Sequence, residues 1–168
     1  MSKFTSFFVI AFALLLTVSC TRNDAQREFE QEAYRSPDGY TETAQNNGEV
    51  LSNDPDDWRT SPLFQGLIIV KPPYPNPVTT NQPVWFEIGV TGVNSINGLQ
   101  VFTRLDNGEF ISLFENFETL QPGDFPPFQI NPIEFGMNGT PEGARGLNRI
   151  YIFNANSQLI SYGDILVE

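Results

Sequence analysis

Val84-Trp85-Phe86-Glu87-Ile88-Gly89-Val90 is the stretch that decides the fold. From Val84 onward every second residue is a large apolar one, and Trp85, Glu87 and Gly89 stand between them. Side chains of a β-strand point alternately to the two faces of its sheet, so this alternation predicts a strand with one buried face. Trp85 and Glu87 are expected to share its outer face.

A tight hairpin is predicted after this strand. Residues 99–105 and 109–114 flank Asp106-Asn107-Gly108. An Asn-Gly pair readily adopts the positive φ angles of a two-residue hairpin turn. The two flanking runs are therefore expected to pair as antiparallel strands.

The end of the chain predicts a second hairpin. Residues 147–154 and 159–167 are joined by Ala155-Asn156-Ser157-Gln158. In the first of these runs, the residues at 150–153 (I-Y-I-F) place large apolar side chains on both faces. A strand of this kind is expected in the middle of its sheet, with both faces covered.

Prolines interrupt the strand pattern in two places. Residues 66–71 form a short apolar run that ends at P-P-Y-P-N-P (72–77), which is predicted as an extended corner because proline cannot donate to a ladder. Residues 115–146 are rich in loops and prolines, with short strand-like runs at 128–130 and 133–135.

About seven short strands at roughly ten-residue spacing, without a convincing helix, predict an all-β fold. We expect an antiparallel β-sandwich over residues 61–168, and an open barrel is the alternative.

The start of this domain resembles a known family. Residues 74–81 (Y-P-N-P-V-T-T-N), the alternating strand and residues 98–102 (G-L-Q-V-F) look like the opening of the immunoglobulin-like domains that end many secreted Bacteroidetes-type proteins, including type IX sorting domains. The resemblance implies an immunoglobulin-like fold and a bacterial lineage. Residues 115–146 and the ending Tyr162-Gly163-Asp164-Ile165 depart from that family, so its sorting function is not carried over.

The N-terminus has the pattern of a signal peptide. Lys3 precedes an apolar run at residues 7–18, and Ser19 is the small residue before a cleavage point at Cys20. The run is too short to span a bilayer, which takes about 20 residues. Residues 1–20 resemble a bacterial lipoprotein precursor, with Thr17 as a departure from its usual Leu. The resemblance implies that Cys20 is lipidated and, with Thr21 after it, that the protein is held at the outer membrane. Ordinary secretion is the alternative.

Residues 20–60 are predicted as a lipidated, acidic and flexible linker between the signal peptide (1–19) and the sandwich. Residues 24–34 favour a short amphipathic helix that is marginal alone. The polar residues 35–60 contain too few apolar side chains to offset the entropy of ordering them. The acidic run at 53–57 (N-D-P-D-D) lacks the ligand spacing of a calcium loop, and is expected to be solvated.

Composition excludes several classes of function. The chain has no histidine and a single cysteine, which rules out Ser/His/Asp and Cys/His nucleophiles and histidine- or cysteine-ligated metal sites. A net charge of −11 does not provide the basic surface that nucleic acids require. We therefore predict no metal, no cofactor and no nucleic-acid partner.

Two binding surfaces are predicted for the folded domain. Trp85 beside Glu87 suits a sugar or a partner loop, and the alternative is that Trp85 packs beneath a loop or beneath residues 58–64. The second surface is the loop region that carries Phe117, Phe125, Phe128 and Phe135. Its alternative is that these rings plug the open ends of the sandwich.

These features favour a non-catalytic, membrane-tethered envelope lipoprotein that presents a β-sandwich to a protein or glycan. The first alternative is a structural accessory subunit of an outer-membrane or surface complex. A more distant alternative is a hydrolase that uses two carboxylates. Spacing singles out no pair among the candidates Glu87, Glu115, Glu118, Asp124 and Glu134.

Overall fold

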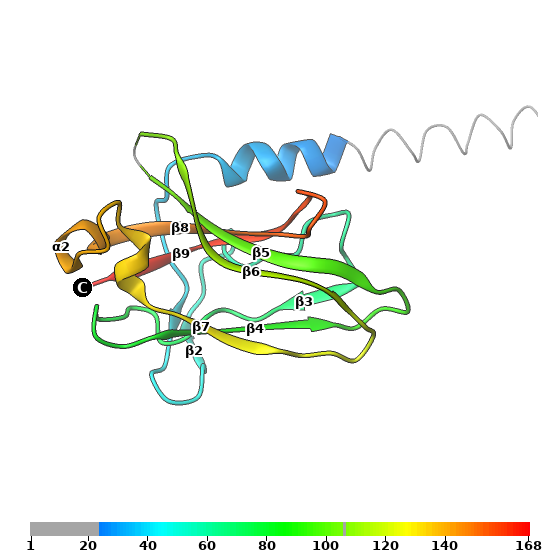
Figure 1. Cartoon of the computed structure of the whole chain (residues 1–168), viewed down its shortest axis with the longest axis horizontal. Coiled ribbons are helices and arrows are strands. Elements are labelled where there is room, and N and C mark those ends of the chain that lie inside the picture. The colour runs from blue at the N-terminus through cyan, green and yellow to red at the C-terminus, as the bar shows by residue number, and fades with distance from the viewer. Residues whose placement is uncertain (1–23, 106) are drawn as a thin grey trace, which may run out of the picture.

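The structure is a computed structural model that describes residues 24–105 and 107–168. Its centre is two antiparallel sheets packed face to face (Figure 1). The larger sheet has the order β6-β5-β8-β9, and the smaller has the order β3-β4-β7. The strands of the larger sheet are β5 (Ile96–Arg104), β6 (Phe110–Leu120), β8 (Gly146–Phe153) and β9 (Leu159–Val167). Those of the smaller sheet are β3 (Ile68–Val70), β4 (Val84–Val90) and β7 (Pro127–Ile130).

The predicted all-β class and antiparallel sandwich are confirmed. The alternating stretch is β4, with the predicted bounds, and both predicted hairpins are present as β5–β6 and β8–β9. β8 lies between β5 and β9, as its two apolar faces indicated.

One predicted strand-like run is helical instead. The residues Pro132–Phe135 form the short 3₁₀ helix η1. Pro132 stands in its first turn, and the Asn131 side chain accepts a hydrogen bond from the Ile133 N–H. A capping side chain and a proline at the start favour a helical turn over a strand. A second short helix, α2 (Pro141–Ala144), follows it.

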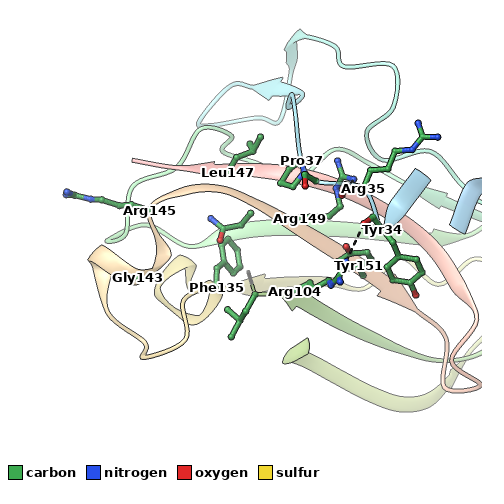
Figure 2. A pocket seen from close by; sticks show the side chains of 13 residues that line it. Tyr34, Arg35, Pro37, Arg104, Phe135, Gly143, Arg145, Leu147, Arg149 and Tyr151 are labelled. Carbon is green, nitrogen blue, oxygen red and sulfur yellow. Dashed lines mark hydrogen bonds between the residues drawn. The ribbon is translucent and has the colours of Figure 1, made fainter. Parts of the chain in front are cut away.

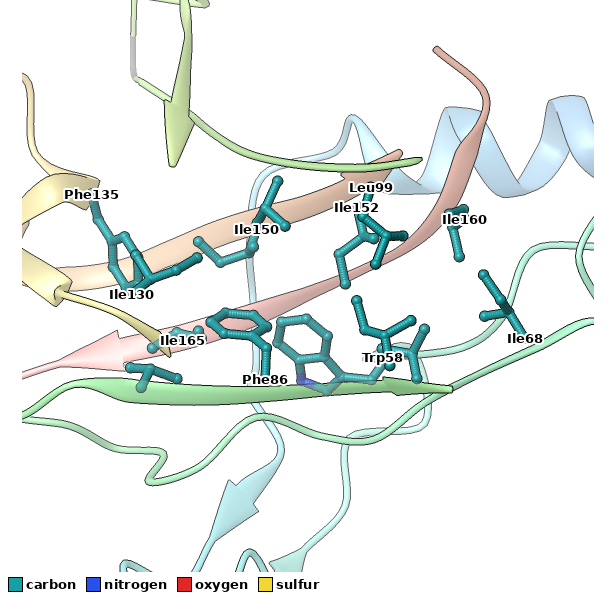
Figure 3. Packing of buried hydrophobic residues seen from close by; sticks show 14 of the residues in the cluster. Trp58, Ile68, Phe86, Leu99, Ile130, Phe135, Ile150, Ile152, Ile160 and Ile165 are labelled. Atoms are coloured by element: carbon teal, nitrogen blue, oxygen red, sulfur yellow. The ribbon is translucent and has the colours of Figure 1, made fainter. Parts of the chain in front are cut away.

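The core lies between the two sheets (Figure 3). The inward side chains of β4 face those of β8 and β9, and Phe86 and Ile150 are buried almost completely. Trp58 reaches this core from outside the strands. Its ring is 4% exposed and meets the Phe86 ring edge-on, with centroids 6.1 Å apart. The indole also lies directly against Gly163, where no side chain intervenes.

The predicted flexible linker needs correction over residues 24–60, which pack against the sandwich. Residues 24–33 form a helix on the outer face of the larger sheet, drawn in blue in Figure 1. Phe29 and Ala33 of this helix are buried with Tyr151, Leu159 and Tyr162. The outer faces of β8 and β9 thus provide the apolar surface that residues 24–60 alone lack.

Arg149 fixes the end of this helix. Its Nε and Nη2 form a two-pronged ion pair with the buried Asp164 carboxylate, at 2.7 and 2.6 Å. Its Nη1 donates to the carbonyls of Glu32, Ala33 and Arg35, of which the Arg35 bond is the shortest at 2.8 Å. A cation at a helix C-terminus satisfies carbonyls that have no partner within the helix.

The chain from residue 35 to residue 61 is also held by the sandwich. It includes the two short strands β1 (Glu42–Thr43) and β2 (Val50–Ser52). Trp58 N–H donates to the Tyr162 carbonyl, and Ser61 N–H donates to the Ile160 carbonyl, both at 2.8 Å. This segment therefore covers the outer edge of β9, which would otherwise offer unpaired backbone groups.

Within the described ranges, no helix is long and apolar enough to cross a membrane.

Candidate binding face on the smaller sheet

The outer face of the smaller sheet gathers aromatic and charged side chains. We call the set formed by Lys71, Tyr74, Trp85, Glu87 and Phe125 the aromatic platform. Trp85 is 38% exposed, so it does not pack beneath a loop or beneath residues 58–64. Trp85 and Tyr74 exchange two backbone hydrogen bonds, Trp85 N–H to Tyr74 at 2.7 Å and Tyr74 N–H to Trp85 at 3.0 Å. The extended corner of prolines thereby sets Tyr74 beside Trp85.

An ion pair stands next to the two rings. Lys71 Nζ lies 2.6 Å from Glu87 Oε2, and the Tyr74 hydroxyl donates to Glu87 Oε1 at 3.4 Å. The Lys71 ammonium also lies 5.0 Å from the centre of the Phe125 ring, within cation–π range. Glu87 is thus oriented by two neighbours while its carboxylate stays at the surface.

Phe125 completes the platform because β4 has a glycine beneath it. A Cβ atom at Gly89 would collide with the Phe125 ring. The missing side chain lets the ring approach the strand closely, and it remains 41% exposed.

A shallow cavity of about 630 Å³ lies on the β7 side of Trp85, and none of the five platform residues lines it. Gln129 pairs with Trp85 across β4 and β7 and also lines this cavity. The other polar groups that line it come from Thr80, Asn81, Asn131 and Glu134. Amides, a hydroxyl and a carboxylate beside a flat aromatic surface are the groups with which proteins orient a polar ligand.

The predicted phenylalanine surface does not form as one surface. Phe128 is partly buried and packs against the core, with ring centroids 5.2 Å from Phe86 and 4.2 Å from Phe114, and Phe135 is only 1% exposed. The register of β7 and the position of Phe135 in η1 turn both rings toward the core. Phe117 is 65% exposed but belongs to β6 of the larger sheet.

The candidate carboxylates are spread over several elements, and only Glu115 and Glu118 share one. Glu87 is on β4, Glu115 and Glu118 are on β6 of the other sheet, Asp124 is in the loop before β7, and Glu134 is in η1. Among the residues that the structure describes, no group of three or more His, Cys, Asp or Glu side chains is placed to hold a metal ion. Cys20 lies outside the described residues.

Sequence reasoning missed Lys71, Tyr74 and Gln129. Each reaches Trp85 or Glu87 from a different strand or segment, so no local pattern links them. The extended proline-rich segment at residues 72–77 could have indicated Tyr74. It follows β3 directly, so its backbone groups can pair with β4, as those of Tyr74 do with Trp85.

No family model matches the chain, and no curated protein matches it. One similar solved structure is a β-glucosidase involved in saponin metabolism from intestinal bacteria. It is 13% identical, with a TM-score of 0.38, and the match covers 54% of this chain and 14% of that chain. The chain therefore spans a small part of that enzyme's length, and a TM-score this low carries no inference about activity.

Proposed function

We propose that this protein is a non-catalytic, membrane-tethered envelope lipoprotein that binds a glycan with the outer face of its smaller sheet. The observation that carries the proposal is the aromatic platform, where Trp85 is exposed beside the oriented carboxylate of Glu87. A flat ring packs against the apolar face of a sugar, and a carboxylate accepts hydrogen bonds from its hydroxyl groups.

Lipidation at Cys20 would hold the sandwich close to the bilayer. Four Cα–Cα steps separate Cys20 from residue 24, where the described helix begins, so the two are at most about 15 Å apart. The helix is itself packed on the sandwich. The tether is therefore short, in contrast to the long flexible spacer expected from composition, and it raises the effective concentration for glycans of the same envelope.

Binding to envelope polysaccharides tests the proposal. The purified chain is incubated with a panel of insoluble and soluble bacterial polysaccharides, and the retained fraction is measured for Trp85→Ala, Glu87→Gln and the parent. Phe117→Ala is the matched control, because it removes an exposed ring from the other sheet. We expect Trp85→Ala to weaken retention about tenfold or more, and Phe117→Ala to leave it unchanged. Equal losses in both variants, or no retained polysaccharide, would overturn the proposal.

The lipid anchor is tested by mass. Protein extracted from membranes with detergent should begin at Cys20 and carry the added mass of acyl chains. A Cys20→Ser variant should appear in the aqueous fraction, because two or more acyl chains are what make such an attachment stable. An unmodified N-terminus on membrane-extracted protein would refute this part of the proposal.

One observation favours the accessory-subunit alternative. β6 is the outer strand of the larger sheet, and it exposes Phe117. An exposed strand edge can accept a strand from another β protein. Two irregularities in the β5–β6 register, at Asn97/Leu99 and Val101/Phe102, interrupt this edge and make such pairing less favourable. A stoichiometric complex after gentle membrane extraction, lost on Phe117→Asp, would support the subunit role.

A further inference from the structure

A second cavity, of about 370 Å³, lies apart from the aromatic platform. It forms where the end of the N-terminal helix meets the end of β5 and the start of β8 (Figure 2). The side chains that matter for its chemistry are those of Arg35, Arg104, Arg145, Arg149 and Tyr151.

The charge of this cavity is opposite to that of the chain. Four arginines line it, out of nine Lys and Arg in a sequence of net charge −11. Of the described residues that line the cavity, none is Asp or Glu. A concave site lined by one sign of charge concentrates ions of the opposite sign.

The four arginines are not equivalent. Arg149 is neutralised by Asp164 and saturated by helix carbonyls, so it forms the floor. Arg104 donates from Nη1 to the Tyr34 carbonyl at 3.3 Å, a contact drawn as a dashed line in Figure 2. The ion pairs found among the described residues include none formed by Arg35, Arg104 or Arg145. Three guanidinium charges are thus left without a carboxylate partner there.

Tyr151 adds a neutral donor to the same space. Tyr151 is 1% exposed, and burial raises the pKa of its phenol, so the hydroxyl keeps its proton at neutral pH. Figure 2 shows Arg104 close to Tyr151 in the middle, while Arg35 and Arg145 extend on either side. Long arginine side chains at the rim can turn toward a ligand that enters.

We propose that this cavity binds an oxyanion group, a phosphate or a carboxylate, carried by a small soluble molecule. The planar fork of a guanidinium matches two oxygens of such a group, and bonds between charged partners are the stronger ones. Arg104 is the central contact, and Arg35 and Arg145, which extend away from it in Figure 2, turn inward from the rim to reach the anion. The site is independent of the glycan face, because the two share no residue.

Inorganic phosphate and acetate are the probes, titrated into the purified full chain by calorimetry, with chloride at matched ionic strength as the blank. Binding to the folded state should also raise the melting temperature. We expect Arg104→Gln and Arg145→Gln each to weaken phosphate binding about tenfold. Arg27→Gln is the matched control, since it removes one exposed arginine that does not line the cavity. Arg145→Gln keeps the test sound if Arg104→Gln fails to fold.

Two further experiments complete the test. One separates a lipid headgroup from a free anion, and the other separates this cavity from the aromatic platform. Vesicles of phosphatidylglycerol are compared with vesicles of phosphatidylcholine, and Trp85→Ala is titrated with phosphate. Phosphate binding that survives Trp85→Ala and is lost in the arginine variants supports the proposal. Binding to anionic vesicles without binding of free phosphate or acetate would overturn it, as would equal weakening by Arg27→Gln.

Discussion

The surroundings of Asp57 act in opposite directions on the pKa of its carboxyl group. Its carboxylate accepts the Thr41 N–H at 2.7 Å and the Asp164 N–H at 3.0 Å, and the residue is 8% exposed. These two bonds favour the charged form. Burial and the neighbouring charge of Asp164 oppose it more strongly, and they raise the pKa of Asp57 to about 7 from an ordinary 3.8.

The raised pKa of Asp57 predicts a pH dependence of stability. Between about pH 4 and pH 7 the folded chain holds a proton that the unfolded chain has released, so the free energy of unfolding falls as pH rises through this window. The slope from this group is at most about 1.4 kcal/mol per pH unit. Urea unfolding followed by tryptophan fluorescence from pH 5 to pH 8 measures it.

Asp57→Asn is the control for this pH dependence. The amide removes the titrating group, so the stability profile of the variant should be flatter than that of the parent over the same window. The variant should also be less stable, since an amide accepts only one of the two N–H donors with its oxygen. Identical slopes in parent and variant would assign the pH dependence to other groups.

Two glycines on strands form a matched pair. Gly163→Ala places a methyl group against the buried indole of Trp58, and Gly89→Ala places one against the half-exposed ring of Phe125. A packed core resists extra volume, so we expect Gly163→Ala to cost about 1–3 kcal/mol of unfolding free energy. Gly89→Ala should cost less, because Phe125 can move into solvent, but it should weaken polysaccharide binding. Denaturant midpoints and retention assays on both variants check this, and equal stability losses would argue against it.

At the scale of elements, the N-terminal helix depends on β8 and β9 for its stability. Arg149 caps its carbonyls, and Arg59 ties Glu32 at 2.7 Å to the Tyr162 hydroxyl at 2.9 Å. Phe29 rests on Tyr162 with ring centroids 5.1 Å apart. A helix of this length is marginal in water, so these contacts decide that it forms.

Arg149→Met is expected to lower the free energy of unfolding by about 3 kcal/mol or more, because it leaves the buried Asp164 charge without a partner. Amide exchange over residues 24–33 should accelerate more than exchange in β5. Adding Asp164→Asn should restore part of the lost stability, since the unpaired charge is then gone. The control is Arg27→Met, which replaces an exposed arginine of the N-terminal helix. It should change the free energy of unfolding by about 0.5 kcal/mol or less.

At the scale of the whole molecule, the segment from residue 24 to residue 61 is part of the fold. It places a helix on one face of the larger sheet, a tryptophan in the core and a backbone edge along β9. The buried Asn76 joins it to the sandwich, with its amide donating to the Thr41 and Asp164 carbonyls at 2.8 and 2.9 Å. The segment and the sandwich are therefore expected to unfold together.

Cooperative unfolding is tested with two probes. Far-ultraviolet circular dichroism reports mainly the helix and strands, and tryptophan fluorescence reports Trp58 and Trp85, so the two transitions should coincide in urea. Amides at Trp58 and Ser61 should exchange as slowly as those of the neighbouring strand β9. Rapid exchange over residues 35–61 in the folded protein would instead support the flexible linker that composition predicted.

The strands themselves were readable from the sequence because their signals are local. Alternation over residues 84–90, the turn at Asn107-Gly108 and the two-faced strand that became β8 each depend on neighbours a few positions away. These patterns determined the fold class, both hairpins and the central place of β8. They also placed Trp85 and Glu87 correctly on an outer face.

Only the tertiary structure decided which surface each remaining side chain meets. Phe125 and Phe128 are three residues apart, yet their rings lie on different faces. Phe125 precedes β7 and lies over Gly89 on the platform, whereas the register of β7 sets Phe128 opposite the inward-facing Phe86, so that it packs against the core. Residues 24–60 order because Arg149, Asp164 and Asn76, all distant in sequence, supply their partners. Burial and pairing depend on contacts between segments that are distant in sequence. Composition gives the number of apolar residues in a segment, but not the surface of the folded domain on which they pack.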